Sequence, residues 1–344
     1  MIATAEDVQI TAIPQPERDM VDLLLASYAY YPYRHWRGFG ADVPRHALRW
    51  DLLHGHRRQG SMWLLARNGT DVVGLVLVEP SPWESEWLVT SIGELRHLIT
   101  LGDRTQRQAI AEALLATVRQ RLRGSIECLI HRVDVDDYAT MAALQTQGFR
   151  LVDTTISFIR GREFRPYLRR RFRRPCPVRP YRDEDWPAVE AIARQSHFGG
   201  RLYNDPRFAR PRVDALYLEW VRRCCQRDFA DEVIVALRHD HIGGFLSYQF
   251  QRGLYEAARI RLVGRGLLAV GPEHRGLALE LIRGASLSEV RADFLQCDIH
   301  LENLDLLGLY GRALRMDVAH IQHVFHGWLD TGPEANRVPL SDDG

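Results

Sequence analysis

Two side chains that can accept a proton lie in the stretch FLQCDIHLEN, whose alternation of apolar and polar residues is typical of a β-strand. Because successive side chains of a strand point to opposite faces, Asp298 and His300 share a face with Gln296 and Glu302. A carboxylate or an imidazole placed there can take a proton from an attacking amine, directly or through water. The same face can equally be solvated or ion-paired. His326, close to the end of the chain, is a further candidate for this site.

Small residues occur where an apolar strand, LLAV, gives way to a helix in PEHRGLALELI. The first backbone N–H groups of a helix have no partner within it and carry the positive end of its dipole, so small residues there let a phosphate approach closely. Arg275, Gly276 and Ala278 are therefore candidate phosphate-binding residues. A plain strand-to-helix turn is the alternative, which a lone small-x-small pattern does not exclude.

The elements that must position these residues occur twice along the chain. In the first half, two apolar runs flank the turn Asn68-Gly69, which predicts a hairpin. WESEWLVTSIGELRHLITL is predicted to be a further pair of strands. A helix in QRQAIAEALLATVRQRLR, the strand SIECLIHRV, a helix that ends before Gly148 and the strand FRLVDTTISFIR follow.

A similar order recurs after an arginine-rich segment, from DEVIVALRHDHIGGFLSYQF to a last strand near IQHVFHGWL. Strands that alternate with helices favour mixed sheets covered by helices. We therefore expect an α/β (α+β) fold with two tandem domains, each a mixed central β-sheet flanked by helices.

The segment GREFRPYLRRRFRRPCP, residues 161–177, differs sharply in composition from its surroundings and is predicted to link two domains at 1–160 and 178–344. Clustered arginines can also bind the phosphates of a nucleic acid. We favour a linker whose arginines meet acidic groups or water, because the formal net charge of the chain is only +1. No nucleic acid partner is expected.

Composition excludes several classes of protein. Hydrophobic residues make up 46% and charged residues 26% of the 344 residues, as in ordinary globular proteins. The 5 cysteines form no C-x-x-C pair, so neither a disulfide framework nor a metal site is expected. Neither a signal peptide nor an apolar stretch long enough to cross a membrane is found, so a cytoplasmic protein without a membrane partner is expected.

Several passages of the second half together resemble the GNAT acyltransferases. VRPYRDEDWPAVEAIA is similar to the family's opening strand and helix, and LLAVGPEHRGLALELI to its cofactor motif. RLYNDPRFARPRVDALYLEWVRR and FHGWL resemble the branch that acetylates nucleotide-linked amino sugars, the dTDP-fucosamine type. PSPWESEW, QRQAIAEALL and ALQTQGF in the first half resemble the same family. The two matches cover nearly the whole chain.

The resemblance implies roles for particular residues. Backbone N–H groups of Leu268 and Val270 would stabilise the thioester carbonyl, and Arg275, Gly276 and Ala278 would hold the pyrophosphate. The family protonates its leaving thiolate with a tyrosine seven residues after an asparagine, a spacing that Asn303 and Tyr310 match. The residues expected to line the acceptor pocket are Tyr203, Arg207, Tyr217 and His326.

The chain departs from the family's pattern in three places, two in the second half and one at the corresponding positions of the first half. Glu273 stands where an arginine or glutamine is usual, and Leu314-Arg315 stands where a Gly-Phe pair follows the tyrosine. In the first half, Leu144 and Asp137 occupy the tyrosine and asparagine positions. Since leucine cannot donate a proton, we expect the first half to be a degenerate, structural or regulatory domain that still has room for a nucleotide.

The resemblance implies an enzyme that transfers an acetyl or larger acyl group from acetyl-CoA, another acyl-CoA or an acyl carrier protein to an amine or hydroxyl of a small-molecule acceptor. The oligomeric state is left open between a monomer and a homodimer. The alternative is a protein of this fold that has lost acyl transfer and catalyses another reaction or senses a ligand.

Overall fold

The chain forms two compact units in its computed structural model, which describes residues 8–36, 38–161, 178–274, 276–287 and 292–329. The first unit comprises Met1–Arg34, Pro44–Thr154 and Ile321–Gly344, and the second comprises His35–Val43 and Thr155–His320. The predicted linker, apart from Gly161, and the predicted phosphate-binding residue Arg275 lie outside the described residues. No helix within the described ranges is both long and apolar enough to cross a membrane.

The first unit is built on a sheet with the strand order β1-β2-β3-β4-β5-β12. The bounds of these strands are Val8–Ile13, Met62–Asn68, Asp71–Pro80, Ile92–Thr100, Cys128–Asp134 and Asp317–Trp328. β4 and β5 run parallel, and the other neighbours are antiparallel. The predicted hairpin at Asn68 and Gly69 is confirmed: it joins β2 to β3, and Gly69 has a φ of 59°.

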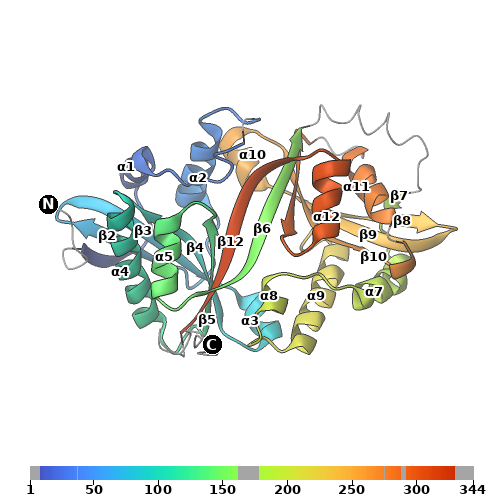
Figure 1. Cartoon of the computed structure of the whole chain (residues 1–344), viewed down its shortest axis with the longest axis horizontal. Coiled ribbons are helices and arrows are strands. Elements are labelled where there is room, and N and C mark those ends of the chain that lie inside the picture. Colours follow the sequence, from blue (N-terminus) through green and yellow to red (C-terminus); the bar gives the residue numbers. More distant parts are fainter. Residues whose placement is uncertain (1–7, 37, 162–177, 275, 288–291, 330–344) are drawn as a thin grey trace, which may run out of the picture. The chain divides into compact units, whose positions relative to one another are not determined.

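Helices cover both faces of this sheet. The first-unit helices are α1 (Arg18–Ser27), α2 (Val43–His54), α3 (Pro82–Leu88), α4 (Arg104–Leu122) and α5 (Tyr138–Thr146). Apolar residues of α1 and α2 join one core cluster, and those of α4 and α5 join another on the opposite face. α4 and α5 lie side by side (Figure 1). The apolar stripes that predict helices in the sequence are thus the surfaces that cover the sheet.

The expected pair of strands in WESEWLVTSIGELRHLITL is wrong in its first member, because WESEWL belongs to α3 and only β4 is a strand. Pro82 at the first helical position already has a helical φ, which favours a helix start there. Ser85 Oγ accepts a hydrogen bond from Ile92 N (2.9 Å) and thereby ties the helix to the start of β4.

The second unit repeats this arrangement with the strand order β7-β8-β9-β10-β11-β6. The bounds are Val178–Pro180, Glu232–Arg238, His241–Phe250, Leu262–Val270, Phe294–His300 and Arg150–Gly161. Here β10 and β11 form the parallel pair. Its helices are α7 (Trp186–Gln195), α8 (Arg201–Asn204), α9 (Arg210–Cys225), α10 (Arg252–Ala258), α11 (Leu277–Leu287) and α12 (Leu304–Gly308), and α12 runs into a π-helical turn, Leu309–Ala313.

Each unit receives its sixth strand from the other half of the sequence. β12 pairs with β5 from Gln322–Trp328, and β6 pairs with β11 from Thr155–Gly161. The contact-defined units therefore differ from the expected ranges 1–160 and 178–344. Local pattern identifies a strand but not its partner, so the sequence analysis did not predict which strand fills the free edge of β5 or β11.

Candidate functional site

The parallel strand pair of the second unit separates partway along its length. β10 and β11 are paired only from Leu262–Arg265 with Phe294–Cys297. A bulge against β9 follows directly, where Gly266 and Leu267 stand opposite Ser247. Ser247 Oγ accepts a hydrogen bond from Leu267 N (2.9 Å), and a Cβ at residue 266 would lie 2.6 Å from this oxygen. Any larger residue at position 266 would displace the Ser247 hydroxyl from this bond, so glycine here is compatible with the bulge.

Beyond the bulge, Leu268 and Val270 continue to pair with β9 through Leu246 and Gly244. Their other backbone edge lies past the end of the β10–β11 ladder. Backbone groups on such an edge need hydrogen-bond partners, and an extended ligand that carries amides can supply them. The predicted contact of the two residues with a thioester would use this edge.

The start of α11 is open on the side of Gly276. A Cβ built at Gly276 meets no described atom within 4 Å, and Glu273 is exposed nearby. Gly244 of β9 differs, because a Cβ there would lie 2.9 Å from the carbonyl oxygen of Ala269 and 3.1 Å from Leu281. Glycine at position 244 lets α11 pack closely on the sheet, whereas glycine at position 276 leaves the helix start accessible. Ala278 is buried, so its methyl group faces the core.

Tyr310 lies in an apolar cluster that joins several elements of the second unit. Its side chain is buried, and its ring stacks on Phe158 with centroids 6.0 Å apart. Ile282 of α11 and Cys297 of β11 belong to the same cluster, and Leu268 packs against it. The cluster that holds the tyrosine therefore reaches the part of β10 that follows the bulge. Asn303 caps α12, since its Oδ1 accepts a hydrogen bond from Leu306 N (3.1 Å).

The family's Gly-Phe pair was expected to correspond to Leu314-Arg315 after Tyr310. The backbone of the structure shows a different correspondence. In the first unit, Phe149 N donates to Leu144 O, and the residue before it, Gly148, has a φ of 79°. In the second unit, Met316 N donates to Tyr310 O, and the residue before it, Arg315, has a φ of 49°. Arg315-Met316 is thus the equivalent pair, and Leu314 is not part of it. The π-helical turn accommodates the one extra residue.

Asp298 and His300 project from the end of β11, near different neighbours. Asp298 is exposed and accepts hydrogen bonds from Ser157 Oγ (2.5 Å) and Gln296 Nε2 (3.0 Å). His300 packs against Gly200, where a Cβ would lie 2.3 Å from the imidazole Cε1. A carboxylate and an imidazole are both side chains that can take part in proton transfer.

Two of the residues predicted to bind the acceptor, Tyr203 and Tyr217, belong to one aromatic group. The rings of Tyr203 and Tyr217 are nearly parallel, with centroids 5.4 Å apart. Tyr203 donates to Asp214 (2.8 Å) and Tyr217 to Gly199 O (3.2 Å). Burial and the Asp214 carboxylate raise the pKa of Tyr203.

A second set of contacts ties this group to β11. Glu302 accepts hydrogen bonds from Gly200 N (2.7 Å) and Asn204 Nδ2 (3.2 Å), which holds the loop beside His300. Arg207 is exposed in the same region. The structure thus brings these residues to one end of β11, whereas the predicted acceptor residue His326 is buried in the first unit, opposite Ile130 of β5.

The corresponding helix start in the first unit is closed by the protein itself. Asp103 accepts a hydrogen bond from Gln106 N (2.9 Å), and the Gln106 side chain accepts one from Asp103 N (2.9 Å). This capping box uses backbone donors that a phosphate would need. Arg107 is the next residue, and its Nη2 donates to both oxygens of the buried Asp137 carboxylate.

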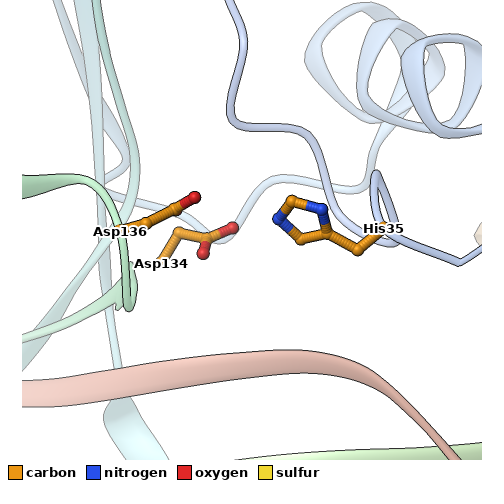
Figure 2. A group of neighbouring side chains, drawn as sticks. All are labelled: His35, Asp134 and Asp136. Carbon is orange, nitrogen blue, oxygen red and sulfur yellow. The ribbon is translucent and has the colours of Figure 1, made fainter.

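Further carboxylates of the first unit lie at the end of β5 and just after it. Asp134 and Asp136 lie close to each other there (Figure 2). Arg34 Nε lies 3.2 Å from Asp134, and Arg34 also pairs with Asp136. Arg34 and Arg107 both stack on the ring of Tyr30, at 4.5 Å and 4.4 Å from its centroid. Side chains of the first unit thus fill the region beside its own helix start.

One polar group was not found by sequence reasoning. Asp51 of α2, Glu79 of β3, and Arg96 and His97 of β4 meet in the first unit. The available signal was the consecutive pair Arg-His inside the otherwise apolar run LRHLIT. Such a pair does not reveal which residues of other elements it meets, so the sequence alone does not predict this group.

Comparison with known proteins identifies the fold. No protein-family model and no curated protein matches the chain. The chain is similar to the structure of a tandem GNAT protein from the clavulanic acid biosynthesis pathway without acetyl-CoA, with 12% identity, a TM-score of 0.53, and coverage of 94% of this chain and 98% of that one.

Two further solved structures are similar. For a GCN5-related N-acetyltransferase from Sphaerobacter thermophilus the identity is 12%, the TM-score 0.56, and the coverage 96% and 98%. For a conserved protein of unknown function from Staphylococcus epidermidis the values are 11%, 0.50, 74% and 90%. The chain therefore has the fold of a tandem GNAT protein, as expected from its sequence.

Proposed function

We propose that the second unit transfers an acyl group from acyl-CoA, or from a carrier-protein thioester, to an amine or hydroxyl of a small molecule. The observation that carries the proposal is the open start of α11 beside the point where β10 and β11 separate. Backbone donors at that helix start suit a pyrophosphate, and the edge of β10 suits the two amides of a pantetheine arm.

The chemistry then needs three steps that residues of the second unit support. The acceptor nitrogen or oxygen attacks the thioester carbonyl, whose developing negative charge is stabilised by backbone N–H groups near Leu268. The acceptor's proton passes to Asp298 or His300, directly or through water. The C–S bond breaks, and the departing thiolate takes a proton from Tyr310, which packs in the same cluster as Leu268.

An amino sugar or another specialised metabolite is the acceptor that we favour, since RLYNDPRFARPRVDALYLEWVRR resembles the amino-sugar branch and a protein of similar fold comes from a biosynthetic pathway. Tyr203, Arg207 and Tyr217 are its proposed contacts. Asp298→Asn and His300→Gln distinguish the two bases, because only the variant that removes the true base should lower the rate steeply.

Titration calorimetry with acetyl-CoA tests the proposal. We expect one binding site per chain, abolished in Gly276→Asp, because a carboxylate placed at an open helix start repels pyrophosphate without a clash. Ala109→Asp, in the first turns of the capped helix α4, is the matched control and should leave binding intact.

If acetyl-CoA, longer acyl-CoAs and carrier-protein thioesters all fail to bind, the proposal is wrong. The alternative is then a protein of this fold that has lost acyl transfer. Exposed Glu273 beside the helix start is the observation that favours it, because an acid there opposes the binding of an anion.

A further inference from the structure

We propose that the first unit has a site of its own for a small molecule with a neutral amino or hydroxyl group, which donates a hydrogen bond to Nδ1 of His97. Asp51 holds the imidazole in place from the other side. This site is separate from the acyl-transfer site proposed in the second unit.

A bulge in β4 brings the residues of the site together. The ladder between β3 and β4 pairs Val78 with Leu95 and Leu77 with His97, which leaves Arg96 as an extra residue. In a regular strand, two consecutive side chains point to opposite faces. The bulge instead lets Arg96 and His97 both reach Asp51 on α2.

The bulge occupies the same place in both units, directly after the last parallel pair, Leu95 with His131 in the first unit and Arg265 with Cys297 in the second. The residues that follow differ in chemistry. Arg96 and His97 are polar, whereas Gly266 and Leu267 cannot exchange a proton. The first unit therefore has at this point a proton acceptor that the bulge of the second unit lacks.

Asp51 is held as a carboxylate. It accepts hydrogen bonds from Arg96 Nε (3.2 Å) and Nη2 (3.0 Å) and lies 2.6 Å from His97 Nε2. Burial opposes its ionisation, but the hydrogen bonds from His97 and Arg96 outweigh burial and lower its pKa. A carboxylate only accepts hydrogen bonds, so Nε2 of His97 donates to Asp51. In the neutral imidazole, Nδ1 then has a free lone pair.

Within the described ranges, no residue hydrogen-bonds to Nδ1 of His97, and the His97 side chain remains 15% exposed. An imidazole that is oriented by a carboxylate and has its second nitrogen free is the arrangement that accepts protons in many enzymes. A ligand O–H or N–H group is the matching partner.

The charges around the dyad indicate what kind of ligand fits. Glu79 is buried, and its nearest described partners are Ser61 Oγ at 3.4 Å and Arg96 Nη1 at 3.5 Å, so it keeps capacity for another donor. Arg57 lies 3.6 Å from Asp51. Two guanidinium groups balance two carboxylates, so the site selects by hydrogen bonding and not by net charge. This favours a neutral amine or alcohol over an anion.

Multiple-bond ¹H–¹⁵N NMR spectra report directly which nitrogen of each histidine carries the proton. We expect the Nε2–H form for His97. His131 of the same unit is the internal control, because it is buried and its Nδ1 must donate to Leu95 O (2.7 Å), which requires the opposite form. His97→Gln and His131→Gln assign the two signals.

Glucosamine and glycerol are the probes, and acetate is the anionic control. Saturable movement of the His97 Nδ1 signal with either probe, at constant His131 signals, is the expected result. Asp51→Asn should place the proton on Nδ1 and weaken the response at least about tenfold, as loss of a hydrogen bond to a charged group predicts. Circular dichroism of this variant checks that the fold is kept.

Two outcomes overturn the proposal. A proton on Nδ1 of His97 in the unaltered protein would mean that no acceptor is available. The expected form without any response to glucosamine or glycerol would mean that water alone fills the position. Calorimetry with acetyl-CoA is independent of both results, so failure here and failure of the second unit's proposed function are distinguishable.

Discussion

Tyr310 combines burial with an unusual backbone. Its ring packs between elements that meet near the bulge of β10, and the π-helical turn around it holds one residue more than the equivalent turn of the first unit. Inserted residues of this kind often occur at functional sites. In the proposed reaction the Tyr310 phenol would protonate the leaving thiolate, which Leu144 at the corresponding place in the first unit cannot do.

Replacing Tyr310 by phenylalanine keeps the ring and removes only the hydroxyl. We expect acyl transfer to fall by about 10²–10⁴-fold, the usual contribution of a positioned acid. The melting temperature and the affinity for acetyl-CoA should change little. Unaltered turnover in this variant, measured by release of free thiol, would exclude Tyr310 as the acid.

The bridge between Arg107 and Asp137 allows a second test at single residues. Asp137→Ala leaves a half-buried guanidinium without its carboxylate partner and should lower the free energy of unfolding by about 1–3 kcal/mol. Asp136→Ala is the matched control, because that carboxylate is 44% exposed and should cost less than about 1 kcal/mol. Urea unfolding measures both, and equal losses would contradict a structural role for the bridge.

At the scale of elements, the two units differ most at the start of the helix that follows their bulged strand. α4 begins with a capping box, whereas α11 begins after a glycine with open space around it. A capped helix start contributes to stability, and an open one is available to an anion. We infer that the first unit uses this helix to stabilise its fold and the second uses it to bind a ligand.

Two glycine substitutions test this view of α11. Gly244→Ala should destabilise the protein by about 1–3 kcal/mol, because its Cβ would press on Ala269 O and Leu281. Gly276→Ala should change stability by less than about 1 kcal/mol, since no described atom opposes the new methyl group. Thermal unfolding of the two variants makes the comparison. A large loss in Gly276→Ala would mean that the helix start is packed and not open.

At the scale of the whole molecule, the sheet of each unit includes a strand from the other half of the sequence. β12 completes the sheet of the first unit, and the part of β6 from Thr155 onward completes that of the second. Each unit thus depends on a segment encoded in the other half of the chain. Removal of either half should leave the remaining sheet without a strand.

Amide hydrogen exchange measured by mass spectrometry can test whether each unit takes a strand from the other half of the sequence. Phe325→Ala, in β12, should create a cavity costing about 3–5 kcal/mol in the first unit and weaken protection of β5. Phe158→Ala, in β6, is the reciprocal variant and should weaken protection of β11 in the second unit. If each variant instead weakened protection only in its own half of the sequence, the pairing of β12 with β5 and of β6 with β11 would be wrong.

The sequence by itself determined most of the elements and the fold class. Apolar periodicity places the helices and strands, and Asn68-Gly69 and Gly148 mark turns because glycine tolerates a positive φ. It also pointed to Gly276 and to Tyr310, whose spacing from Asn303 resembles that of a known family. These features are local, so a stretch of a few residues carries all the information that they need.

Only the tertiary structure decided which strand completes each sheet, where each bulge lies and which charged groups meet. Strand edges present the same backbone groups whatever the side chains, so sequence pattern does not choose between β6 and β12. The meeting of Asp51, Glu79, Arg96 and His97 depends on a bulge that rotates one side chain to another face. The placement of His326 in the first unit depends on strand pairing across the whole chain, which no local pattern encodes.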